Sequence, residues 1–384
     1  MQQNHFFSIY RYFLLLFVMT ALGTVSFVGC SSTPAGEGQT QTDGGNTTDG
    51  GAKPSFKELS ADGYTTVSDV TIHNKVPADI DEIKKLMAES KVDWKKVQVM
   101  YEKGKHSVKS DGSIRTLNGF ASSPGNFSKY SPDAVAYFKD KGICQLSPVD
   151  GFKCTEGKFV DEFIESYAIN GTGPFKGASD AQRAAAVKAG LLVLMSYWVR
   201  LEFGKALAKV KDGNLEPLKG APHNWDEAMA FYWGPEGKHS LYEAADNLSK
   251  KYNLSESVNK AFFKALVDGL KEMTEKKAAP TAATAAGTKQ LHRLFLLGAL
   301  DAAKQIDEAK DADAKDAARW RGFGYWLGVG DIVAKADGDA AKAFQDVFYT
   351  KKTDKDTFKA IQEAIKKSLS GMGMKAEDFG DALK

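Results

Sequence analysis

Three residues with metal-binding side chains lie close together near the middle of the chain: His223, Asp226 and Glu227. On a helix, His223 and Glu227 are i,i+4 neighbours, and Asp226 lies beside them on the same face. An imidazole with carboxylates suits iron, which takes nitrogen and oxygen ligands. The alternative is that Asn224 caps this helix, because acids in a first helical turn are favoured by the helix dipole without any metal.

Two further groups supply candidate ligands. His239 and Glu243 are also i,i+4 neighbours, and Asp246 follows three residues later; the alternative is a solvated start of a helix. Glu202 stands in the most apolar segment of the chain, where a buried carboxylate needs an arginine or a metal as its partner; the alternative is an exposed helix face. The candidate metal ligands are therefore His223, Asp226, Glu227, Glu243, Asp246 and Glu202.

The rest of the sequence carries no catalytic motif. The HExxH, GxSxG and Walker sequences are absent, so we expect a binding protein and not an enzyme. The glycines between Gly322 and Gly330 depart from the dinucleotide-binding fingerprint and favour close helix packing, and His292 lies among leucines and is expected in the core. Seven aromatic residues could form the base of a sugar-binding cleft, but their helical spacing favours a place in the core. They are Trp198, Trp225, Tyr232, Trp233, Trp320, Tyr325 and Trp326.

Cys30 follows an apolar run of 16 residues, Phe13 to Val28, that has the parts of a secretory signal peptide. A cysteine at the cleavage point is similar to the signal of bacterial lipoproteins, in which the thiol is acylated. The alternative, a transmembrane anchor, needs about 20 residues. We therefore expect residues 1–29 to be removed and Cys30 to tie the exported protein to a membrane, at the periplasmic face of the outer membrane or at the cell surface.

The other two cysteines, Cys144 and Cys154, are separated by a short loop that contains glycine and proline. A compartment outside the cytoplasm permits a disulfide between them. The alternative is a thiolate metal site, but two cysteines at this spacing without a nearby histidine match zinc sites poorly. The sequence therefore predicts a Cys144–Cys154 disulfide.

Composition limits the remaining possibilities. Residues 30–53 contain no large aliphatic or aromatic side chain, so this segment cannot offset its ordering entropy and is expected to be a flexible linker. The formal net charge of the 384-residue chain is only +2, which leaves no basic surface of the kind that nucleic-acid binding requires. We expect no nucleic-acid partner.

From Pro77 onward the apolar residues recur with helical spacing, and no alternating strand pattern appears. Ser179 with Gln182 forms a capping box that opens a long apolar helix. The segment Tyr64–Ile72 has β-branched residues and predicts a short extended arm. The fold class is therefore all-α, a helical bundle over residues 54–384. Asn224 with Glu227 is expected to open a further helix. The later helices are expected at 240–252, 256–275, 281–309, 315–334, 340–348 and 358–370, and the earlier ones at 77–87, 93–103, 131–142 and 159–170.

The helical region contains an internal repeat. Trp94–Tyr101 resembles Trp225–Tyr232, with tryptophan and tyrosine seven positions apart in both copies, and Gly-Lys-His-Ser follows each copy. Duplicated helical units that contribute similar helices to a shared core are the natural interpretation. We expect the two units at about residues 77–210 and 211–336, followed by further helices.

The second copy also carries a resemblance to a known family. Trp225–Gly234 is similar to the repeated Trp-Asp-x-Ala-x-x-Phe-Tyr-x-Gly signature of the algal iron-assimilation proteins, the low-iron-inducible periplasmic family, which has bacterial lipoprotein members. The resemblance covers about residues 77–336. It implies iron assimilation outside the cytoplasm, with an iron ion or iron chelate as ligand and a transporter or surface protein as partner. The alternative is a surface lipoprotein that acts as a non-metal interaction or glycan-binding module.

The two copies of the repeat differ at the two positions that follow the tryptophan. Lys95 and Lys96 occupy the positions that Asp226 and Glu227 hold in the second copy. Cationic side chains repel a metal ion, whereas carboxylates bind it. The predicted iron site therefore falls in the second copy alone.

Overall fold

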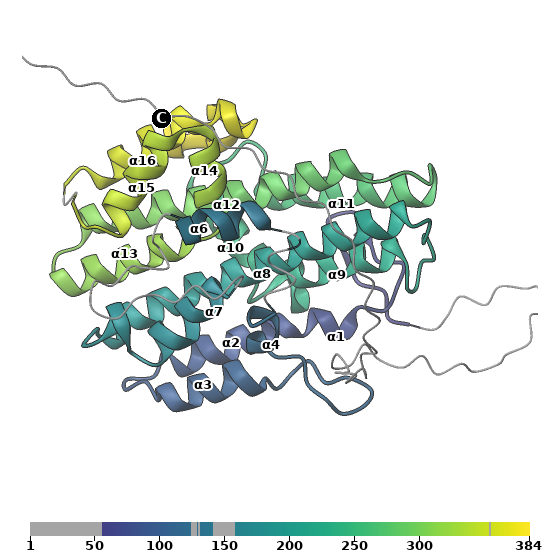
Figure 1. The fold of residues 1–384 in the computed structure, drawn as a ribbon, viewed down its shortest axis with the longest axis horizontal. Helices are drawn as coiled ribbons and strands as arrows, with labels where there is room; N and C mark the ends of the chain where they lie inside the picture. The colour runs from purple at the N-terminus through teal and green to yellow at the C-terminus, as the bar shows by residue number, and fades with distance from the viewer. Residues whose placement is uncertain (1–55, 124–128, 130, 141–157, 353–354) are drawn as a thin grey trace, which may run out of the picture. The chain divides into compact units, whose positions relative to one another are not determined.

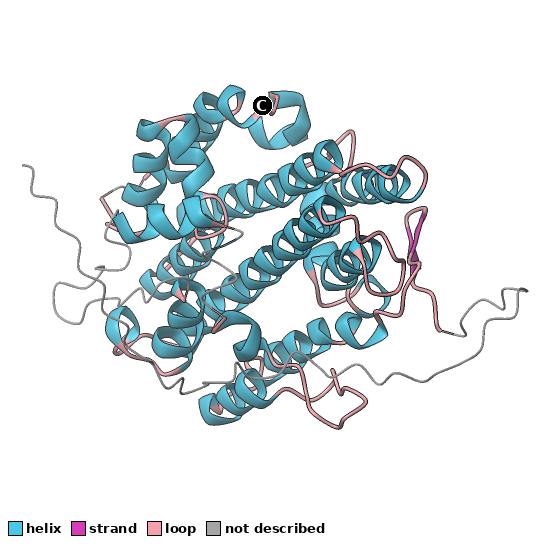
Figure 2. Cartoon of the chain, turned by 45° about the vertical axis from the view of Figure 1, so that its right-hand side comes forward, coloured by secondary structure: helices cyan, strands magenta, loops and turns pink. Residues whose placement is uncertain are grey.

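Helices make up nearly all of the regular structure in the computed structural model, which describes residues 56–123, 129, 131–140, 158–352 and 355–384 (Figure 2). Within these residues the only strands are β1 (Ser60–Ala61) and β2 (Tyr64–Thr65), which pair antiparallel. The predicted all-α fold is confirmed. The extended arm predicted at Tyr64–Ile72 is a strand only at Tyr64–Thr65, and its end, Thr71 and Ile72, is helical. Cys30, Cys144 and Cys154 lie outside the described residues.

Two long helices form the centre of the bundle (Figure 1). Helix α8 (Asp180–Lys211) packs against α9 (Ala221–Trp233) and α13 (Ala312–Trp326). Helix α12 (Thr281–Glu308) packs against α13 and α11 (Val258–Thr274). Ser179 caps α8 by accepting a hydrogen bond from the backbone N–H of Gln182, as the capping box predicts.

Helix α8 is long and apolar enough to cross a membrane by length and composition. However, 83% of its most apolar window is buried inside the protein. A helix that is apolar on all sides is expected in the middle of a large core as well as in a membrane. Helix α8 is therefore the core helix of this bundle.

Shorter helices surround the centre. The first part of the body contains α1 (Thr71–Asn74), α2 (Val76–Leu86), α3 (Trp94–Lys103), α4 (Leu117–Ala121), α6 (Pro132–Asp140), α7 (Phe159–Asp161) and a π-helix (Glu162–Ile169). Later helices are α10 (Leu241–Lys251), α14 (Gly330–Ala336), α15 (Gly338–Phe348) and α16 (Thr357–Ser368). Short 3-10 turns lie at Gly173–Phe175, Pro235–Gly237, Ser370–Met372 and Ala376–Leu383.

One predicted helix, 315–334, is wrong because the structure divides it. Helix α13 ends at Trp326 and α14 begins at Gly330, with non-helical backbone at Val329. The glycines of this region sit against other helices, since a Cβ at Gly322 would lie 2.1 Å from Phe348 Cε1. Their close-packing interpretation is confirmed.

The aromatic residues weighed as a sugar-binding floor belong to the core. Five of them are buried, and the other two are half-buried and pack against the same core: Trp198, Trp225, Tyr232, Trp320, Trp326, Trp233 and Tyr325. His292 is also buried, as expected, although its Nε2 has no hydrogen-bond partner among the described residues. The aromatic side chains stabilise the bundle and leave no exposed stacking platform.

The two repeat copies form equivalent helices, α3 and α9, and each ends at a glycine with positive φ: Gly104 at 61° and Gly234 at 66°. In both copies the tyrosine donates to a side-chain oxygen of another helix. Tyr101 bonds Asp161 at 2.7 Å, and Tyr232 bonds Asn259 at 2.7 Å. The equal spacing of tryptophan and tyrosine in the two copies therefore serves helix packing. The division of the chain into two repeat units stays a prediction.

Candidate functional site

Helix α9 begins earlier than its sequence suggests, and this decides where its acids lie. The helix starts at Ala221 after the N-cap Gly220, with Pro222 in the first turn. Proline is favoured there because its missing N–H would be unpaired anyway and its φ is already helical. Asn224 is therefore not a cap, and the capping alternative for Glu227 is wrong.

Glu227 is the centre of a histidine–carboxylate cluster. Its Oε1 lies 3.1 Å from His223 Nε2, one turn earlier in α9, and 3.1 Å from His73 Nε2, in α1. Only 11% of the Glu227 side chain is exposed. The two imidazole rings meet edge to face, with centroids 6.2 Å apart and an interplanar angle of 77°. One carboxylate oxygen thus faces two imidazole nitrogens in a nearly dry position.

Glu202 reaches the same cluster from α8. Asn224 Nδ2 donates to Glu202 Oε2 at 2.6 Å and to Glu227 Oε2 at 3.1 Å, so the two carboxyl groups lie side by side. Glu202 Oε1 accepts from Lys205 Nζ at 2.9 Å. Glu202 is 2% exposed, so the alternative of an exposed helix face is wrong.

The pKa values of Glu202 and Glu227 are shifted in opposite directions. Burial and the neighbouring Glu227 raise the pKa of Glu202 to about 8, although Lys205 opposes this. Burial would also raise the pKa of Glu227, but the contacts of its carboxylate with His223 and His73 hold that pKa well below its usual value. At neutral pH Glu202 carries the proton and Glu227 is ionised.

His73 is kept neutral by its surroundings. Burial lowers the pKa of His73 to about 4, against the opposing charge of Glu227 and with a further decrease from Arg115. Its ring lies against Phe231, with centroids 5.7 Å apart. Its Nδ1 is buried and has no hydrogen-bond partner among the described residues. A neutral imidazole is the form that binds metals.

Asp226 belongs to a different set of contacts from Glu227. It accepts hydrogen bonds from Tyr64 Oη at 2.6 Å, from the Val67 backbone N–H at 2.9 Å and from Ser68 Oγ at 2.7 Å. All three donors come from the N-terminal arm, residues 56–70. Asp226 is fully buried and binds this arm to α9.

The arm also orients His223. His223 Nδ1 lies 2.9 Å from Ser68 Oγ. Because the Ser68 hydroxyl donates its proton to Asp226, it accepts from His223, which places the N–H on Nδ1. The Nε2 of His223 then faces the Glu227 carboxylate, and a proton or a metal cation between them joins the two groups. Histidines that bind a metal through one ring nitrogen usually donate the N–H of the other nitrogen to a neighbouring polar group, as His223 does to Ser68.

The other predicted ligands lie elsewhere. Glu243 Oε2 accepts from the His239 backbone N–H at 3.1 Å and lies 3.5 Å from Lys84 Nζ. Asp246 pairs with Lys250 at 2.7 Å on the solvent-exposed side of α10. The structure therefore brings together three of the six predicted ligands, His223, Glu227 and Glu202, and places Asp226 behind them.

His73 is the residue that the sequence did not reveal. It stands 150 positions before His223, between Ile72 and Asn74, and the acid four positions before it, Asp69, accepts from Thr71 and is not part of the cluster. Its only signal is its type, since the chain has six histidines. Its place beside Glu227 depends on the packing of α1 against α9.

The distances within the cluster can be compared with those between the ligands of a metal ion. Among the described residues, no group of three or more His, Cys, Asp or Glu side chains is arranged so that it could hold a metal ion as it stands. Ligands about 2.1 Å from a metal and at right angles to each other are about 3 Å apart, which matches both 3.1 Å separations around Glu227 Oε1. An ion would have to replace the protons of these contacts, and the side chains would have to move to surround it.

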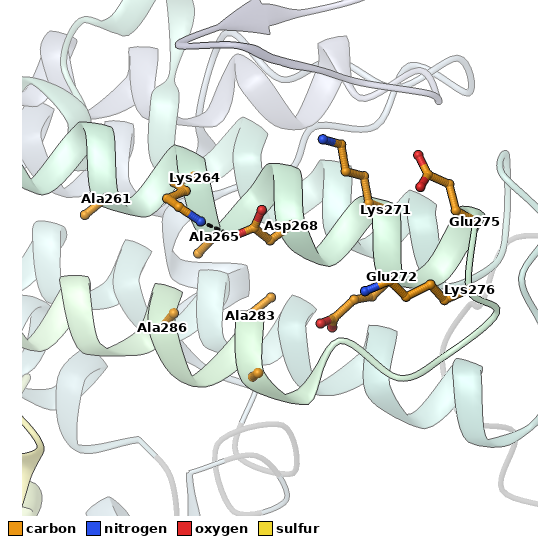
Figure 3. Close-up of a pocket in the computed structure, with 11 residues that line it drawn as sticks. Ala261, Lys264, Ala265, Asp268, Lys271, Glu272, Glu275, Lys276, Ala283 and Ala286 are labelled. Atoms are coloured by element: carbon orange, nitrogen blue, oxygen red, sulfur yellow. Dashed lines mark hydrogen bonds and ion pairs between the residues drawn. The ribbon is translucent and has the colours of Figure 1, made fainter.

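The structure also has a surface hollow whose lining residues differ from those of the cluster. It occupies about 400 Å³ between α11 and α12 (Figure 3). Alanines line its floor, and Lys264 pairs with Asp268 at 2.5 Å on its rim. It contains no histidine or cysteine and shares no residue with the Glu227 cluster.

Comparisons with known proteins agree with the resemblance carried by α9. No curated protein and no solved structure matches the chain. The family model described as "low iron-inducible periplasmic protein" matches residues 49–384. Because this match spans most of the sequence, the chain belongs to the low iron-inducible periplasmic protein family.

Proposed function

We propose that this protein binds iron outside the cytoplasm at the cluster of His73, His223 and Glu227, with Glu202 as a fourth ligand. The observation that carries the proposal is the approach of two imidazole nitrogens to one oxygen of Glu227, both at 3.1 Å. The family is described as periplasmic and induced by low iron, and that description names no enzymatic activity. Iron is therefore the expected cargo, not a cofactor.

The donor set suits this role. Two histidines and one carboxylate form the ligand set of many non-haem Fe(II) sites. Glu202 lies beside Glu227 and can become a ligand once it loses its proton. Metal uptake by protonated ligands releases protons, so binding should strengthen as pH rises toward 8.

The surroundings of the cluster supply orientation. Ser68 and Asp226 hold the His223 ring in the orientation that turns Nε2 toward Glu227. Groups that orient a ligand in this way typically change metal affinity about 10–100-fold when removed. Asp226 is thus proposed as a positioning residue and not as a ligand.

The remaining parts of the proposal concern location. A lipid on Cys30, followed by the linker of residues 30–53, would hold the helical body near a membrane surface. The linker has a reach of roughly 25 Å by random-coil scaling. A membrane-bound transporter or a surface protein would receive the iron there. The Cys144–Cys154 disulfide remains part of the same extracytoplasmic proposal.

Equilibrium dialysis of the untagged full chain against Fe(II) and Fe(III) tests the metal site. Glu227→Gln should lose binding, because it removes the charge between the two histidines. Glu243→Gln is the matched control, since Glu243 contacts a histidine backbone and a lysine away from the cluster. Equal iron binding by Glu227→Gln and the parent would reject the site.

A further inference from the structure

We infer that the His73–His223–Glu227 cluster selects divalent iron, Fe(II), over ferric iron. This inference rests on the proposed function, because it names the form of iron taken at the same site. The first reason is the donor type. Two of the three central donors are imidazole nitrogens, which suit divalent first-row metals, whereas ferric iron favours anionic oxygen ligands.

The second reason is that the phenols of Tyr64 and Tyr232 are already engaged in hydrogen bonds. Ferric sites commonly use phenolate oxygen, but the Tyr64 hydroxyl donates to Asp226 at 2.6 Å. Tyr232, on the same helix as Glu227, donates to Asn259 at 2.7 Å. Both tyrosines are buried by the packing around them, so turning either hydroxyl toward Glu227 would break a buried hydrogen bond.

The third reason is the local charge. Lys205 Nζ lies 2.9 Å from Glu202 Oε1, and Arg115 is close enough to Glu227 and Glu202 to interact with both charges. The carboxyl groups of Glu202 and Glu227 can supply at most two negative charges, and the two neighbouring cations offset them. In a nearly dry site this leaves no net negative charge to compensate an entering ion, and each further unit of positive charge is more costly. A trivalent ion is penalised more than a divalent one.

The competing interpretation is a ferric site completed by oxygen ligands from the ferric chelate itself. In that case the two histidines would contribute little to affinity, and a trivalent ion would bind more tightly than a divalent ion. The two interpretations therefore predict opposite orders of affinity for ions of different charge at one set of side chains.

The test compares Co(II) and Ga(III), which are redox-inert in air and stand for ferrous and ferric iron. Both are supplied as nitrilotriacetate complexes to the full chain, and anaerobic Fe(II) is measured alongside. We expect Co(II) and Fe(II) to bind with a dissociation constant at least tenfold lower than that of Ga(III). His223→Gln and His73→Gln should each raise the Co(II) constant at least tenfold.

His239→Gln is the matched control, because His239 also contacts a carboxylate, Asp81, at 2.8 Å, but away from the cluster. It should leave the Co(II) constant unchanged. Thermal unfolding with and without Co(II) checks that each histidine variant is folded, since a ligand that binds only the native state raises the melting temperature.

The outcomes separate the two claims. Tighter Ga(III) than Co(II) binding that is lost in Glu227→Gln would overturn the ferrous preference while the iron site stands. Failure of every ion to bind, or binding that survives both Glu227→Gln and His223→Gln, would overturn the site itself and the preference with it.

Discussion

Asp226 and Glu227 are neighbours in sequence, but their carboxylates bind different parts of the protein. Helical geometry turns adjacent side chains about 100° apart. Asp226 faces the N-terminal arm and accepts from Tyr64 and Ser68, whereas Glu227 faces His73 and His223. Ser68 connects the two sets because it also contacts His223. Asp226 therefore binds the arm to α9, and Glu227 contacts the two histidines.

Removing the Asp226 charge should therefore weaken the fold and the site by different routes. Asp226→Asn should lower the free energy of unfolding by about 2 kcal/mol, because hydrogen bonds to a charged acceptor are lost. Metal affinity should fall about 10–100-fold, since His223 loses its orienting contact. Urea unfolding and Co(II) titration measure the two effects. Asp246→Asn should change neither, and a similar response in both variants would contradict this assignment.

The buried carboxyl of Glu202 should make stability depend on pH. Its pKa rises from 4.5 to about 8 on folding, so the native state holds a proton that the unfolded state loses. The stability associated with this proton is complete below pH 4.5 and is lost as pH rises toward 8, with a slope of up to about 1.4 kcal/mol per pH unit.

Urea unfolding of Glu202→Gln at several values between pH 5 and pH 8 tests this dependence. Glutamine cannot ionise, so the variant should show a flatter profile than the parent across this window. Glu243→Gln should keep the parent profile, because Glu243 lies away from the buried pair. Parallel profiles for the parent and Glu202→Gln would show that Glu202 does not hold the proton.

Gly322 is a sensitive packing position. A Cβ there would lie 2.1 Å from Phe348 Cε1, so Gly322→Ala should lower stability by about 1–3 kcal/mol through overpacking. Gly338→Ala is the matched control, because nothing lies within 4 Å of its Cβ position. Differential scanning calorimetry should show a lower melting temperature for the first variant only. Equal melting temperatures would mean that α13 and α15 separate readily.

Cys30 should be the membrane anchor. Cys30→Ser should give a protein that no longer partitions into detergent, because the serine cannot be acylated. Fractionation with a carbonate wash measures the attachment. A variant that remains bound after the wash would identify the Phe13–Val28 run as a true membrane span.

Cys144 and Cys154 should be joined in protein recovered from an oxidising compartment. Peptide mapping by mass spectrometry without reduction should find the two peptides linked, and reduction should release them. A short loop of this kind adds roughly 2–3 kcal/mol by chain-entropy arguments. Recovery of both residues as free thiols would exclude the bridge.

Much of the helical pattern was predictable because its signals are local. Asp93 and Ser179 cap α3 and α8 as their sequence context indicates. Asn224 misled because α9 already begins at Ala221, three residues earlier, so the acids lie deeper in the helix. His73 was unpredictable because its partner Glu227 lies in another part of the sequence, and only tertiary packing brings them together.

The long sequence separation within the site also determines when it can form. Tyr64 and Asp226 are 162 positions apart, and Ser68 and His223 are 155 apart. Contacts that close such long loops form late in folding, because their entropic cost must be met by structure already in place. We expect the metal-binding cluster to be among the last parts of the chain to assemble. Ion capture would then report completion of folding, and a chain still being translocated would have no site to load.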